Sequence, residues 1–107
     1  MHIFRISFHH DDQIFQLHAK CVDCSELYGF IEVEDLIFDE HTGVVIDPSE
    51  ERLKSEFKGV NRLFLPLHSV IRIDEMEHKG KNKILDKEGR KTNIMPFPLP
   101  GNSPQRN

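Results

Sequence analysis

Residues 3–19 read IFRISFHHDDQIFQLHA, two alternating segments around a polar centre. The apolar residues of each segment share one face, because successive side chains of a β-strand point to opposite faces. They are Phe4, Ile6 and Phe8 before the centre and Phe15, Leu17 and Ala19 after it. The centre, 9–13, has the length of a hairpin loop, so the sequence predicts an antiparallel hairpin with turn histidines at its tip.

Beyond a short connection at 20–26, residues 27–38 read LYGFIEVEDLIF, which predicts a strand. Ile31 and Val33 fall on odd positions, whereas Leu36 and Phe38 fall on even ones. A strand whose inward face changes midway needs a bulge or a sharp bend, here at Glu34 and Asp35. A turn at 40–43 and a returning strand at 44–46 are expected to follow.

The clearest helix signal lies at residues 47–50. Asp47 suits the N-cap, Pro48 the first helical position and Glu50 the acid of a capping box. The sequence therefore predicts one short helix over about 48–57.

Two further apolar segments, 62–65 and 70–73, flank Pro66-Leu67-His68-Ser69. They predict two closely joined strands, or one strand with a tight internal turn. The expected fold is mainly β (α+β): a small, strongly bent antiparallel sheet or barrel of five to six strands with one short helix. A half-open α+β sheet is the alternative.

Charge divides the chain in two. Residues 1–76 hold 7 Lys/Arg against 15 Asp/Glu, a net charge of −8, whereas 77–107 hold 7 against 3, a net of +4. We therefore expect a compact β-rich domain at 1–76 and a basic, Pro-rich, disordered tail at 77–107. A body of that size has a marginal core, which favours a homodimer or higher homo-oligomer.

Several classes of protein are disfavoured. No apolar run reaches the roughly 18 residues of a membrane span. The first residues lack the pattern of a signal peptide, and two cysteines three apart are no disulfide framework, so a cytoplasmic protein is expected. No nucleophile motif or paired carboxylates stand out, which predicts a non-enzymatic protein without a cofactor.

Three segments carry a family resemblance: LYGFIEVE at 27–34, DPSEERLKSEF at 47–57 and LPLHSVIRIDE at 65–75. They resemble an uncharacterised family of short, mostly gammaproteobacterial proteins, catalogued as a domain of unknown function, over roughly 3–83. The resemblance implies a bacterial cytoplasmic protein and supplies no activity or catalytic residue.

The strand order also resembles Sm-like and related SH3-like small barrels. In the bacterial RNA chaperones of that type a short turn with a histidine joins the last two strands, and His68 has a comparable place. The helix, however, lies between the last strand pairs here, and the body is acidic.

His18, Cys21 and Cys24 form an H-x2-C-x2-C spacing, and imidazole and thiolate are natural zinc ligands. A structural zinc site needs four ligands, and the chain holds a single C-x2-C pair. The favoured interpretation is two unpaired thiols in a loop and no metal.

Three parts of the chain hold candidates for binding a protein partner. The acidic stripe is either a solvated outer face, which is favoured, or a docking surface for a basic partner, with Glu32, Glu34 and Asp35 as the candidate contacts; the stripe consists of Glu32, Glu34, Asp35, Asp39 and Glu40. His68 is more often structural than functional at such a turn. In the sequence MPFPLPG at 95–101, Phe97 and Leu99 form either a linear motif or part of an unstructured terminus.

The basic residues of the tail can contact phosphates or the acidic body itself, and salt would weaken either contact. They are Lys79, Lys81, Lys83, Lys87, Arg90 and Lys91. Two functions remain: an adaptor that binds an unidentified protein partner, or an Sm-like, RNA-associated regulator that acts as an oligomer, with weak RNA contact through the tail.

Overall fold

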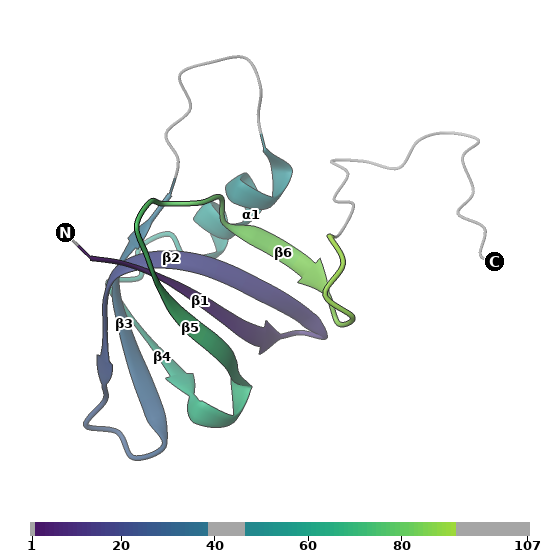
Figure 1. Cartoon of the computed structure of the whole chain (residues 1–107). Helices are drawn as coiled ribbons and strands as arrows, with labels where there is room; N and C mark the ends of the chain where they lie inside the picture. The colour runs from purple at the N-terminus through teal and green to yellow at the C-terminus, as the bar shows by residue number, and fades with distance from the viewer. Residues whose placement is uncertain (1, 39–46, 92–107) are drawn as a thin grey trace, which may run out of the picture.

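The computed structural model describes residues 2–38 and 47–91, in which six strands form one antiparallel sheet (Figure 1). In chain order the elements are β1 Ile3–His10, β2 Gln13–Cys24, β3 Phe30–Ile37, α1 Pro48–Glu56, β4 Arg62–Pro66, the 3-10 helix η1 Leu67–Ser69, β5 Val70–Met76 and β6 Lys83–Asp86. The mainly β fold with one short helix is confirmed. The turn and strand expected at 40–46 and most of the tail lie outside the described residues.

The β1–β2 hairpin is tighter than the sequence predicts. Only Asp11 and Asp12 form its turn, with φ values of 51° and 63°. Both lie in the left-handed region that two-residue hairpin turns require. His9 and His10 therefore belong to β1, where His10 pairs with Gln13, because the ladder continues to the tip.

The predicted bend in β3 is confirmed, and β2 shares it. Asp35 has φ 59°, and the core-facing residues change phase there. β2 changes phase at the same level: Ala19 pairs with Leu36 and Val22 with Val33, all four in or against the core. The connection expected at 20–26 is thus wrong over 20–24, which is strand.

β4 and β5 are neighbours in sequence but not in the sheet. The strand order is β4-β3-β2-β1-β5, with β6 beside β2. Three residues of η1 join the two outermost strands, so the sheet curls strongly (Figure 1). No β4–β5 ladder closes it within residues 2–38 and 47–91.

The helix forms largely as predicted. The Asp47 carboxylate accepts from the backbone N–H groups of Ser49 and Glu50, and Pro48 starts the helix. Leu53 is fully buried against the sheet. Glu50 does not complete a capping box, because its carboxylate accepts hydrogen bonds from Asn82 in the interior.

The folded body extends past residue 76, although the change in charge and composition predicts that it ends there. β6 pairs with the first half of β2, from Gln13↔Asp86 to Gln16↔Lys83. Ile84 is 0% exposed and belongs to the core. β6 completes the sheet where β3 has bent away from β2, so residues 77–91 are not a tail.

The core lies between the curled sheet and α1. Its buried apolar members are Ile6, Phe8, Phe15, Leu17, Ala19, Ile31, Val33, Leu53, Leu65 and Ile84. No helix in the described part of the chain has the length and apolar character to cross a membrane.

Candidate functional site

A buried polar network ties α1 and β6 to β2. The Asn82 side-chain amide donates to the Glu50 carboxylate at 3.0 Å and to the Ile37 carbonyl at 2.9 Å. Its Oδ1 accepts from the His18 backbone N–H at 3.0 Å and contacts His18 Nδ1 at 2.7 Å. Asn82 and Glu50 are both 0% exposed. One amide thus links three elements.

The network fixes the protonation of His18. Because Asn82 Oδ1 can only accept, Nδ1 is the donor and carries the proton. Burial lowers the pKa of His18 below 6.5, against the opposing effect of the Asn82 hydrogen bond. Nε2 is buried and finds no hydrogen-bond partner among the described residues. His18 is therefore a neutral, structural histidine.

The arrangement does not bring the proposed zinc ligands together. His18 faces Asn82, whereas Cys21 and Cys24 are exposed thiols on β2 and not in a loop. Residues three apart on a strand point to opposite faces, so the x2 spacing does not aim both sulfurs at one ion. Within 2–38 and 47–91 no three His, Cys, Asp or Glu side chains gather as a metal site would require.

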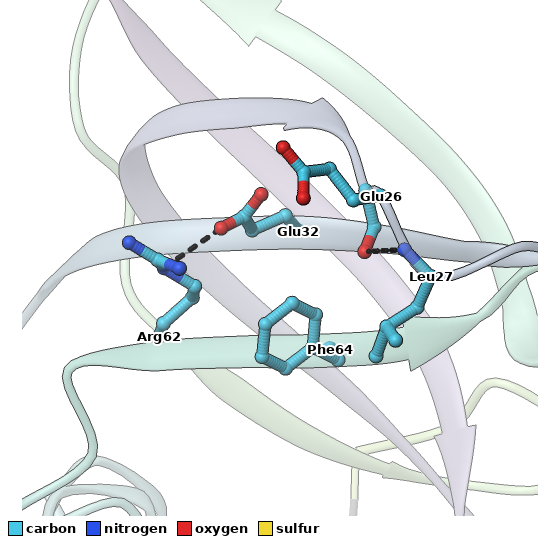
Figure 2. Close-up of a pocket in the computed structure, with 6 residues that line it drawn as sticks. Glu26, Leu27, Glu32, Arg62 and Phe64 are labelled. Atoms are coloured by element: carbon cyan, nitrogen blue, oxygen red, sulfur yellow. Dashed lines mark hydrogen bonds and ion pairs between the residues drawn. The ribbon is translucent and has the colours of Figure 1, made fainter.

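The outer face of β3 and β4 carries a hollow of about 450 Å³, which we call the outer-face hollow. It is lined by Ser25, Glu26, Leu27, Glu32, Arg62 and Phe64. Figure 2 shows the Leu27 and Phe64 side chains on one side, with Glu26, Glu32 and Arg62 around them. The Leu27 backbone N–H donates to the Ser25 hydroxyl at 2.9 Å, which holds the loop in place.

Arg62 forms ion pairs with two residues of the acidic stripe, Glu32 and Glu34. Its Nε lies 2.7 Å from a Glu32 carboxylate oxygen and 2.9 Å from one of Glu34. The hydrogen bond with Glu34 and the charge of Glu32 raise the pKa of Arg62, so it remains a cation. Glu32 and Glu34 are therefore part of an ion-pair cluster, and Asp35 is exposed at the bend; Asp39 and Glu40 lie outside the described residues.

Apolar side chains are exposed around this hollow. Tyr28 is fully exposed, Leu27 is 52% exposed and Phe64 is 37% exposed. β4 has a strand neighbour on one side only within the described ranges, so its other edge is open. An open edge beside exposed apolar groups suits recognition of another chain.

The other predicted site residues lie elsewhere. His68 is exposed in η1. Phe97 and Leu99 are outside the described residues. The six basic candidates follow β5 along one continuous segment, where Lys79 Nζ donates to the Gly80 carbonyl.

Two of these basic positions are held locally. Arg90 forms ion pairs with Asp86 at 3.0 Å and Glu88 at 3.1 Å. The Arg90 backbone N–H also donates to Asp86 and, with the nearby guanidinium, lowers the pKa of that carboxyl. Lys91 forms a β-bridge with Leu85. Both of these charge partners of Arg90 are thus within its own turn, which reduces the charge that Arg90 offers to a phosphate.

Of the residues that line the hollow, the sequence pattern marks only Glu32. A signal was present at Phe64, an apolar residue on the outward phase of a predicted strand. Arg62 could have been paired with Glu34 had the β3–β4 register been known. Leu27 and Glu26 gave no comparable signal, because their position depends on how the β2–β3 loop folds over the sheet.

Comparison with known proteins identifies a family but no relative of known structure or function. No curated protein matches the chain, and no solved structure does. A family model described as a domain of unknown function, DUF1820, matches residues 2–99. This range contains the entire described body and eight residues beyond Lys91. The chain therefore belongs to the DUF1820 family, a domain of unknown function.

Proposed function

We propose that the protein is a small non-enzymatic adaptor that binds a partner protein at the outer-face hollow. The observation that carries this proposal is the hollow itself, with apolar Leu27 and Phe64 beside the carboxylates of Glu26 and Glu32. Such a surface favours a partner segment that combines an apolar side chain with a lysine or arginine.

Charge supports a basic partner. Arg62 is the cation of the hollow, and it is already shared between Glu32 and Glu34. Glu26 is exposed and lies on the rim. A lysine or arginine placed over the hollow would meet net negative charge, and that attraction would decrease as salt increases.

The open edge of β4 supports an extended partner. A segment that adds to β4 forms backbone hydrogen bonds, while alternate side chains reach the face of the sheet. Arg62 and Phe64 are two apart on β4 and share this outer face, opposite Glu34 and Glu32. Alternating basic and apolar residues are therefore the expected recognition pattern.

The test is a peptide-display selection against the immobilised full-length protein. We expect enrichment of peptides in which a basic residue and an apolar residue are two apart. Glu26→Lys should weaken binding of a selected peptide at least tenfold, because it adds a positive charge to the rim. The dissociation constant measured by fluorescence anisotropy checks this.

The matched control is Glu77→Lys, which makes the same charge change at an exposed residue away from the hollow. It should leave the affinity within about twofold, roughly 0.4 kcal/mol. Selected peptides without a basic residue, or equal losses in both variants, would contradict the adaptor proposal.

A second candidate is an RNA-associated regulator that works as an oligomer. The strand order favours it, because β4 and β5 are both outer strands joined by η1, as in Sm-like proteins. Native mass spectrometry of the untagged full-length protein decides: a ring-sized oligomer with added nucleotide mass supports this function. A monomer or dimer without added mass contradicts it.

A further inference from the structure

A second hollow, of about 310 Å³, lies where α1 ends beside β4 and the end of β1. We call it the helix-end groove. Its lining includes Phe8, His10, Phe57, Leu63, Phe64 and Pro66. The groove is thus largely apolar and aromatic, and it shares Phe64 with the outer-face hollow.

The walls of the groove are held by packed rings. The ring centroids of Phe57 and Phe15 lie 6.4 Å apart in an edge-on arrangement, and the ring centroid of His10 lies 4.8 Å from that of Phe15. Gly59, with φ 82°, turns the chain away after the helix, and so α1 does not continue over the groove. An apolar depression with fixed walls is suited to a short apolar segment.

We propose that residues 95–99 of the same chain, MPFPL, occupy the helix-end groove. Phe97 and Leu99 are two apart, so they point to the same side of an extended chain. Each is flanked by prolines, which hold the segment extended and lower the conformational entropy lost when it docks. Prolines also lack backbone N–H donors, which suits contact with an apolar wall.

The chain is long enough to reach. Lys91 bridges to Leu85, Leu85 pairs with Ile14, and Ile14 pairs with His9 at the wall of the groove. Three inter-strand steps of ~4.8 Å make about 15 Å. The six residues from Lys91 to Phe97 span up to about 20 Å.

The extent of the family model fits this occupant. The matched region does not end with the described body at Lys91 but continues to residue 99, the last residue of the proposed segment. Phe64 lines both the helix-end groove and the outer-face hollow, so the two hollows are neighbours along β4. A segment docked in the groove would therefore lie directly beside the proposed partner site.

NMR of the full-length protein tests the proposal. We expect NOEs between the Phe97 ring and the methyl groups of Leu63, which lies in the groove. In Phe97→Ala/Leu99→Ala, the methyl signals of Leu63 and Leu65 should lose their ring-current shifts from Phe97. Amide signals of the sheet outside the groove should stay in place, which shows that the variant is folded.

Two control variants accompany it. Tyr28→Ala removes an exposed aromatic ring that does not line the groove, and Gln105→Ala changes the chain beyond the segment; both should leave the Leu63 methyl signals unchanged. Unchanged Leu63 signals in the double variant, without Phe97 NOEs, would overturn the proposal. NOEs found only between labelled and unlabelled copies would also overturn it, because the occupant would then be a second molecule.

Discussion

At the residue scale, the fold depends on one buried amide. Asn82 satisfies the Glu50 carboxylate, the Ile37 carbonyl and two N–H groups of His18. Asn82, Glu50 and His18 have almost no access to water, since they are at most 1% exposed, and Ile37 is half-buried. Buried polar groups that lose their partner retain the cost of desolvation, so a network of this kind is sensitive to a single change.

Asn82→Ala should therefore lower the free energy of unfolding by about 2–4 kcal/mol, because it leaves several buried donors and acceptors unpaired. Urea denaturation measures this. Asn61→Ala, at an exposed position, is the matched control and should change stability by less than about 0.5 kcal/mol. Similar values for the two variants would show that the network contributes little.

His18 gives the molecule a defined pH dependence. Burial lowers the pKa of His18 in the folded state below the ordinary 6.5, with Lys79 and Arg5 acting in the same direction and Glu50 opposing them. Above pH 6.5 both states are largely neutral at this position. As pH falls below 6.5, the unfolded chain binds a proton that the folded chain resists, so stability decreases until the folded pKa is reached.

Within that window the loss approaches about 1.4 kcal/mol per pH unit. His18→Asn keeps a donor toward Asn82 but removes the titration. Its stability, measured by urea denaturation between pH 7 and 5, should fall less steeply than that of the wild type. Parallel pH profiles would assign the acid sensitivity to other groups.

At the scale of elements, the sequence predicts those whose periodicity is strong. The alternation of apolar and polar residues predicted the β1–β2 hairpin, and the change of inward face at Glu34 and Asp35 predicted the bend of β3. The pair Asp47-Pro48 predicted the start of α1. β6 was missed because its four residues lie in a basic segment without periodicity. Its place depends on a gap beside β2 that only the bent sheet creates.

Ile84→Ala measures how much β6 contributes. Ile84 is fully buried, so its truncation should cost about 2–4 kcal/mol through lost burial and the cavity left behind. Lys83→Ala, one residue earlier on the same strand but exposed, should be nearly neutral. Chemical denaturation of both variants provides the comparison, and a small effect of Ile84→Ala would mean that β6 is dispensable.

The candidate site was less predictable than the fold. Charge alone marked Glu32 and Glu34, but the hollow needs the β3–β4 register and the loop that carries Leu27. The H-x2-C-x2-C spacing was misleading. It suggests a metal site only if the two cysteines lie in a loop, whereas β2 continues through both. Local sequence therefore identified charged residues, whereas their neighbours depended on tertiary structure.

At the scale of the whole molecule, the change in net charge along the chain and the end of the folded body fall at different residues. The basic segment begins at residue 77, but its first part supplies Asn82 and Ile84 to the interior. The acidic body is thus completed by a strand from the basic part of the chain.

Truncation of the chain at either residue tests where the folded body ends. A chain that ends at Met76 lacks Asn82 and Ile84 and should lose cooperative thermal unfolding, whereas a chain that ends at Lys91 should keep it. Near-ultraviolet circular dichroism during heating distinguishes them. Cooperative unfolding of the shorter chain would place the end of the folded body at the change in charge.

The shared bend of β2 and β3 has a consequence for chain length. The register is the same on both sides of it, from Ala19↔Leu36 to Cys21↔Glu34, so Lys20 and Asp35 lie opposite each other. Deletion of Lys20 alone would slip all later residues of β2 by one against β3 and turn Val22 out of the core. Insertions and deletions at this level should therefore be tolerated only in pairs, one in each strand.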